Sequence, residues 1–175
     1  MGLMRYAYVH KNLRKLSFEK KVILGSHALT LAACFFPWFE AEPTYEPNFW
    51  FNAFSGPGIL IGFVIFTISL VITLLFLDRL FEKEVVKLPF SENYLYAAAG
   101  TQQILLIILM WSVLLATGND YGDHAIRFGI FVAFIAQVSG LVATFLNYQI
   151  DMQNQAKAFF QHPDADVKAD PKKND

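Results

Sequence analysis

The most informative features of this sequence are the groups that it lacks. Charged residues make up only 17% of the 175 positions, against about 25% in a typical soluble domain. A single cysteine excludes an internal disulfide framework and a CxxC redox centre. The formal net charge of −1 gives no basic field to attract nucleic acid, so no nucleic-acid partner is expected.

Apolar residues, in contrast, make up 55% of the chain and gather in four long runs. A helix needs about 20 mostly apolar residues to cross about 30 Å of hydrocarbon, and it must pair its own backbone polar groups there. A soluble bundle is excluded because Ile59–Leu77 carries no charge on any face. The sequence predicts an all-α fold, that of a polytopic membrane protein with a four-transmembrane-helix bundle in residues 22–148. The predicted spans are 22–39, 57–77, 94–116 and 126–148.

The basic residues predict the orientation of these spans. Of the fourteen Lys and Arg residues, all but Arg127 precede the first run, lie between the second and third, or follow the fourth. The positive-inside rule places these segments in the cytoplasm, so both termini are expected to be cytoplasmic. We expect the bilayer to be a bacterial cytoplasmic (inner) membrane.

The remaining segments are assigned from their composition. Residues 1–21 are basic, and two alternatives stay open for them: a short helix on the inner leaflet, or an orientation signal without fixed structure. Residues 40–56 form an acidic, aromatic outer loop, in which regular structure is limited by prolines within it (Pro43 and Pro47) and beside it (Pro37 and Pro57). Residues 151–175 form a polar tail, which is expected to be largely disordered because it lacks apolar periodicity beyond about residue 161.

Small residues recur at helical spacing on two of the predicted spans. Such stripes let helix backbones approach closely, and close packing drives association in lipid because apolar burial cannot. We expect the stripes to hold the bundle together, although the same stripes would also suit self-association. The predicted helix-packing residues are Gly58, Gly62, Ser69, Thr73, Gly129, Ala133, Gly140 and Ala143.

Four amide side chains, Gln102, Gln103, Gln137 and Asn147, lie in the apolar runs, where each needs a hydrogen-bond partner. One interpretation is that Gln137 and one of the adjacent glutamines join helices. The alternative is that the four amides line a polar path. Adjacent residues on a helix point about 100° apart, so one of Gln102 and Gln103 is expected to meet a different helix, a second subunit or a bound polar group.

The aromatic residues around the first outer loop also have two interpretations. They form a belt at the membrane surface, where aromatic rings are favoured, or a docking patch for a protein partner. The candidate docking residues are Trp38, Tyr45, Phe49, Trp50, Phe51 and Phe54.

Groups for catalysis are scarce. No acidic or basic residue lies in the interior of a run, and no HExxH, GxSxG or P-loop motif occurs. His27 and His124 are expected near opposite membrane surfaces, too far apart to share a metal. We therefore expect no catalytic residue, metal or cofactor. One alternative concerns Leu31–Cys34, which matches a lipoprotein lipobox and would make Cys34 a lipidated N-terminus.

The leading hypothesis is a non-enzymatic structural subunit or assembly factor of a larger membrane complex. Its expected partners are the lipid bilayer and other membrane subunits or further copies of the chain. The alternative is a homo-oligomeric channel or carrier for a neutral or weakly charged small solute. A lipid- or quinone-handling membrane enzyme is a third hypothesis, for which the sequence places no acid, base or metal.

Overall fold

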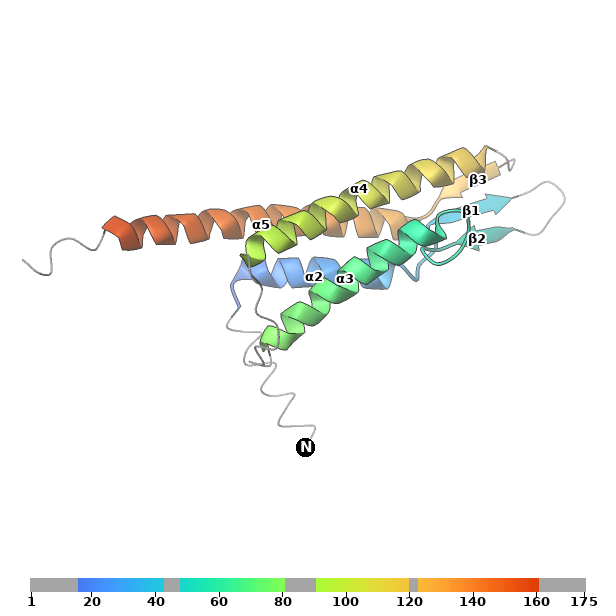
Figure 1. The fold of residues 1–175 in the computed structure, drawn as a ribbon. Coiled ribbons are helices and arrows are strands. Elements are labelled where there is room, and N and C mark those ends of the chain that lie inside the picture. Colours follow the sequence, from blue (N-terminus) through green and yellow to red (C-terminus); the bar gives the residue numbers. More distant parts are fainter. Residues whose placement is uncertain (1–15, 43–47, 81–90, 120–122, 161–175) are drawn as a thin grey trace, which may run out of the picture.

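The computed structural model describes residues 16–42, 48–80, 91–119 and 123–160 (Figure 1). This part of the chain contains four helices and three short strands. The helices are α2 (Phe18–Ala33), α3 (Ile59–Leu80), α4 (Glu92–Gly118) and α5 (Phe128–Phe160). The strands are β1 (Phe39–Glu42), β2 (Phe49–Phe51) and β3 (Asp123–Ile126). Among these helices, α3, α4 and α5 are long and apolar enough to cross a membrane.

Helix α2 corrects the limits of the first predicted span, 22–39. It begins earlier because the side chain of its N-cap, Ser17, accepts a hydrogen bond from the Lys20 amide. It ends at Ala33 because Pro37 disfavours helical geometry just before it and the Trp38 indole N–H donates to the Ala33 carbonyl at 2.7 Å. Its 16 residues are about 24 Å long, which is short for a membrane crossing.

A three-stranded antiparallel sheet corrects the prediction of an all-α fold. The strand order is β2-β1-β3, so the central strand pairs with both neighbours. Strands β1 and β2 use residues of the predicted loop 40–56, whereas β3 lies just before α5. The sheet therefore joins the two outer connections at one end of the bundle (Figure 1). Phe39 and Ala41 of β1 are buried, in alternation with Glu40 and Glu42.

The other three predicted spans coincide with α3, α4 and α5, but their ends differ. The largest difference is in α5, which continues to Phe160, past the predicted end at residue 148. Its 33 residues are about 50 Å long, well beyond about 30 Å of hydrocarbon. Figure 1 shows this end of α5 extending past the other helices. Most of the predicted segment 1–21 and residues 161–175 of the predicted tail lie outside the described residues.

Helix α5 packs most extensively on α2. The small residues of α5 face this contact: a Cβ added at Gly140 would overlap Ser26 of α2, and one added at Gly129 would overlap Trp38. Ala133 and Ala143 are buried in the same way. This close approach leaves the larger side chains of α5 on the side away from α2.

Helix α3 lies between α2 and α4 and contacts both. A Cβ added at Gly58 would overlap Met110 of α4, and one added at Gly62 would overlap the Ala53 carbonyl, which follows β2. Ser69 is buried, whereas Thr73 is half-buried and its hydroxyl makes no hydrogen bond with the described residues.

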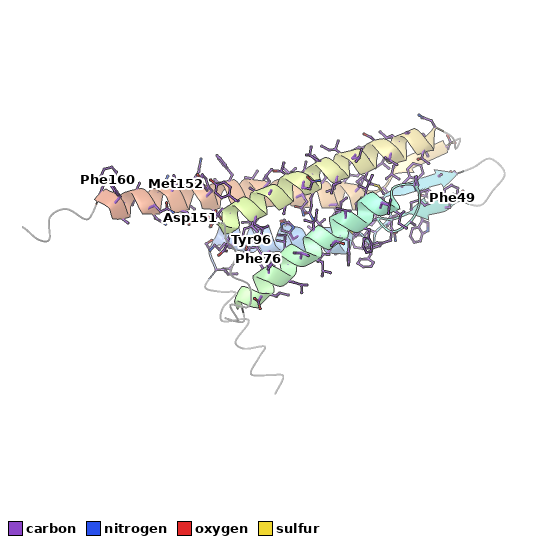
Figure 2. The ribbon with its side chains drawn as sticks, viewed as in Figure 1. Phe49, Phe76, Tyr96, Asp151, Met152 and Phe160 are labelled. Carbon is purple, nitrogen blue, oxygen red and sulfur yellow. The ribbon has the colours of Figure 1, made fainter. Side chains whose placement is uncertain are left out.

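The buried apolar side chains form two clusters at different heights in the bundle. The outer cluster lies next to the sheet and includes Trp38, Phe39, Met110, Leu114 and Ile130. The inner cluster contains Ile23, Ile72, Phe76, Tyr96 and Ala143. The rings of Phe76 and Tyr96 stack with centroids 4.7 Å apart (Figure 2). Along each helix, polar residues fall between the members of the two clusters, and these residues form the candidate site.

Candidate functional site

A buried polar cluster lies between the two apolar clusters and takes side chains from all four described helices. Each of its members is at most 5% exposed. On each helix they lie on the same inward face as the buried apolar residues that precede and follow them, three or four residues apart. The members are Ser26, His27 and Thr30 of α2, Ser69 of α3, Gln103 of α4 and Gln137 of α5. We call this group the polar clasp.

Gln137 joins α5 to α2. Its Nε2 atom donates a hydrogen bond to Thr30 Oγ1 at 2.8 Å and lies 3.5 Å from Nδ1 of His27. The Thr30 hydroxyl donates in turn to the Ser26 carbonyl at 2.9 Å, so it is both donor and acceptor. If Nδ1 of His27 accepts from Gln137, the proton of the neutral imidazole is on Nε2.

Gln103 joins α4 to α3. Its Nε2 atom donates to the Ile65 carbonyl at 3.0 Å and to Ser69 Oγ at 2.5 Å. The side chain of Gln103 also faces His27 of α2. The imidazole therefore lies between two glutamines, one from α4 and one from α5, and the polar clasp connects the four helices.

Two carbonyl oxygens of the clasp, Oε1 of Gln103 and Oε1 of Gln137, make no hydrogen bond within the described residues. Both glutamines are fully buried. A buried acceptor without a partner costs about 1–3 kcal/mol.

Asn147 belongs to a separate polar group at the inner end of the bundle. It donates to Asn93 Oδ1 of α4 at 2.8 Å, and Asn93 donates to the Asp151 carboxylate at 2.7 Å. This group ties the start of α4 to α5. A charged carboxylate is unfavourable in hydrocarbon, so we expect the hydrocarbon layer to end near Asp151.

Gln102 points away from both polar groups. It is exposed on the outer surface of α4 and has no hydrogen-bond partner among the described residues. Two other exposed polar side chains on the long helices, by contrast, have hydrogen-bond partners. Thr67 donates to the Phe63 carbonyl and Ser139 to the Ile135 carbonyl of the same helix, each at 2.8 Å. Among the four predicted amides, the structure therefore brings only Gln103 and Gln137 together.

The structure divides the candidate docking residues of the outer loop. Trp38 is fully buried and hydrogen-bonded to α2, so it is removed from the predicted docking surface. Trp50, by contrast, is 60% exposed. Tyr45 lies outside the described residues. The other three, Phe49, Phe51 and Phe54, are half-buried and pack against the outer cluster.

The sheet is held to the bundle by polar contacts that the sequence did not reveal. Arg127, which follows β3, forms an ion pair with Glu40 of β1. Its amide also donates to the Trp38 carbonyl at 2.8 Å, and the Gly129 amide donates to Pro37 at 3.0 Å. Arg127, the one basic residue that the charge distribution sets apart from the others, is therefore paired at the sheet.

The predicted intramembrane polar residues were all amides, so they did not include His27 and Thr30, which contact the side chain of Gln137. The signal that would have found them is their position on the face of α2 that Ile23 and Ala33 share, where every side chain is buried. Cys34 is also fully buried, at the end of that helix.

The chemistry that the described residues offer is hydrogen bonding in a closed interior. In that part of the chain, no group of three or more His, Cys, Asp or Glu side chains is placed to hold a metal ion. No known protein family, curated protein or solved structure matches the sequence or the fold.

Proposed function

We propose that this chain is a non-enzymatic integral membrane protein that acts as a structural subunit or assembly factor of a larger membrane complex. In this proposal α2 is the fourth crossing element, both termini are cytoplasmic and the sheet lies on the opposite side. The long apolar helices α3, α4 and α5 support contact with the bilayer. Among the described residues, Lys20 and Lys21 at the start of α2 and Lys157 near the end of α5 lie away from the sheet, which supports the orientation.

The position of α2 supports its inclusion as a crossing element despite its length. It lies beside α5 and extends from near the start of α4 to the sheet (Figure 1). After Ala33 the chain continues through Pro37 and the buried Trp38 into β1. The helix and this short extension therefore continue from the start of α4 to the sheet, beside the long helices α3 and α5 that α2 contacts.

The exposed amide of Gln102 is the observation that carries the proposal. Gln102 is about 15 Å along α4 from its start at Glu92, so in this proposal it faces the middle of the hydrocarbon layer. A polar group without a partner there costs several kcal/mol, on the order of an unmade hydrogen bond in apolar surroundings. A neighbouring membrane subunit that presents a polar group would supply the missing partner.

The rival function, a channel or carrier for a neutral solute, needs the four predicted amides along one path. In one copy of the chain they occupy three separate places: the outer surface of α4, the polar clasp and the inner end of the bundle. The clasp amides are also engaged in hydrogen bonds between helices. This arrangement favours the structural role.

The proposal is tested by extracting the protein from its native membrane in mild detergent and measuring particle size. We expect the wild-type chain to migrate in a particle larger than a monomer and Gln102→Leu to shift toward lower mass. Ser139→Ala is the matched control, because that exposed hydroxyl is already satisfied by its own helix. A wild-type chain that runs only as free monomer would contradict the proposal.

The channel or carrier is tested in liposomes that contain the purified protein. Solute flux that disappears with Gln137→Leu, while particle size stays unchanged, would favour that rival. Equal leakage from liposomes with wild-type, variant and no protein would support the structural role instead.

A further inference from the structure

A face of α5 is exposed along its entire length and carries apolar residues at heptad spacing. Within the predicted span the large side chains on this face lie alternately three and four residues apart, which keeps them on one side of a slightly underwound helix. They are Phe131, Ile135, Val138, Val142 and Phe145, all exposed. We call this face, together with its continuation through Gln149, Met152, Ala156 and Phe159, the α5 seam.

The seam continues in the same register beyond the predicted span. Gln149, Met152, Ala156 and Phe159 follow Phe145 at steps of four, three, four and three residues, and all four are exposed. The Phe159 side chain is 80% exposed. Figure 2 shows Met152 on the part of α5 that extends past the other helices, with Phe160 at its end.

Exposed apolar residues inside a bilayer are ordinary, because acyl chains cover them. The segment after Asp151 is different, since that carboxylate lies at the membrane edge and the helix continues for about 14 Å beyond it. In water, Met152 and Phe159 on one face need another apolar surface. Phe159 lies about 12 Å beyond Asp151, out of reach of the acyl chains. The register of the seam is unbroken from Phe159 back into the predicted span, so a second helix accounts for the whole seam better than lipid does.

We propose that the α5 seam pairs with the α5 seam of a second copy of this chain, as a parallel coiled coil that runs from the membrane into the cytoplasm. Two copies in one membrane share an orientation, so the heptads of both helices run in the same direction. This pairing rests on the proposed function, because that function requires a protein partner in the membrane, and it names that partner as a second copy of the chain.

The chemistry of the seam suits self-pairing. In a parallel coiled coil the flanking positions of the two helices face each other, and like charges there would repel. Those positions are uncharged throughout α5; in the extension they are Tyr148, Gln153, Gln155 and Phe160. The charged residues Asp151 and Lys157 lie off the seam. A chain that meets its own copy therefore encounters no electrostatic penalty.

Gln149 gives the pairing a defined register. It occupies a core position of the coiled coil among apolar residues. One polar side chain at such a position fixes the register of the two helices and the number of helices that associate, at some cost in stability. In a symmetric parallel pair it meets the same amide of the other copy, which can both donate and accept. A shift of one heptad would place Gln149 against an apolar residue and lose this bond.

The seam borders an open groove. A groove of about 540 Å³ runs between α4 and α5 and is lined by Tyr94, Ala97, Val142 and Phe145, among others. Val142 and Phe145 belong to both the groove and the seam. The groove leaves the seam uncovered at these two positions.

The test is oxidative cross-linking in native membranes, in a Cys34→Ala background that removes the chain's one cysteine. Met152→Cys and Phe159→Cys lie on the seam, and Asn154→Cys, exposed on the opposite side of α5, is the matched control. A disulfide forms when two Cα atoms come within about 7 Å. We expect a product of twice the 19.9 kDa chain mass with Met152→Cys and with Phe159→Cys. We expect no such product with Asn154→Cys.

Three results would overturn the proposal. Equal yields at Met152→Cys and Asn154→Cys would indicate random collision, and no product at either seam position would indicate no pairing. A product with a chain of another mass would assign the seam to a different partner, and would leave the subunit role of the protein intact. Loss of the larger particle with Gln102→Leu, by contrast, reports on that role and not on the seam.

A second variant pair checks the chemistry of the seam. Met152→Glu combined with Phe159→Glu puts like charges at the core of the coiled coil, and we expect the double variant to lose the dimer. Asn154→Glu should retain it. Neither residue of the double variant is buried in the described fold, so the bundle itself should remain intact. A dimer that survives the double variant would also contradict the proposal.

Discussion

The contact between α2 and α5 allows a sharp quantitative test at Gly140. A Cβ placed on Gly140 would overlap both the Oγ and the Cβ atom of Ser26 in α2. Both residues lie in helices that pack over most of their shared length, so neither backbone moves independently. The Gly140→Ala variant must therefore push the two helices apart or distort the Ser26 side chain.

The magnitude follows from comparison with Gly25→Ala. In a helix interior, replacement of glycine by alanine is favourable by about 1 kcal/mol when the new methyl group has space. A Cβ at Gly25 meets no heavy atom within 4 Å, so that variant should gain this amount. Gly140→Ala has the same intrinsic gain, but overpacking costs about 1–3 kcal/mol. Gly140→Ala should therefore be less stable than Gly25→Ala by the overpacking energy.

The assay is reversible unfolding in mixed micelles, with the denaturing detergent fraction varied and the free energy of unfolding compared among variants. Ser26→Gly in the Gly140→Ala background removes both clashing atoms, so it should recover part of the loss. Equal stability of Gly140→Ala and Gly25→Ala, or no recovery in the double variant, would refute the close contact between α2 and α5.

Two further predictions concern single side chains. Gln137→Leu removes the donor to Thr30 and the contact with His27, and should lower the free energy of unfolding in micelles by about 1–2 kcal/mol. The exposed Gln102→Leu should leave the stability of the isolated chain unchanged. Trp38→Phe loses the hydrogen bond to the Ala33 carbonyl and should destabilise by about 1 kcal/mol in the same assay. Trp50→Phe, at an exposed position, should have no effect; equal effects of the two tryptophan variants would contradict the burial of Trp38.

The long helices could be predicted from the sequence because their signal is local. A run such as Ile59–Leu77 carries no charge on any face. As a helix it is unfavourable in water, because it has no polar face, and favourable in a bilayer, where it pairs its own backbone groups. The same signal failed at the first span, since its apolar residues continue past Ala33 into a turn and a strand. Hydropathy does not distinguish a residue in a helix from one in a buried strand.

The sheet escaped prediction because its strands are short and their pairing is not local. Strand β1 has four residues and pairs with β3, which follows two intervening helices in the chain. Four residues give too little alternation to separate a strand from a loop. The burial of Trp38 escaped for the same reason, because it depends on Gly129 of α5, which leaves room for the indole.

The candidate site was predictable in kind but not in detail. Amides in an apolar run must find partners, and two of the four predicted amides join helices in the polar clasp. Which of Gln102 and Gln103 faces inward depends on the rotation of α4 in the bundle, and that rotation is set by packing against Ser69 and the other helices. The α5 seam was concealed by the predicted end of the fourth span, which falls before Gln149.

The proposed function requires that this chain crosses the membrane as a bundle with both ends in the cytoplasm and the sheet outside. Its most direct test is labelling of single cysteines with a membrane-impermeant maleimide, in intact cells and in the Cys34→Ala background. Asp123→Cys in β3 should react in intact cells, whereas Phe18→Cys and Asn154→Cys should react only after permeabilisation. Labelling of Phe18→Cys or Asn154→Cys in intact cells, or recovery of the chain in the soluble fraction without detergent, would contradict the claim.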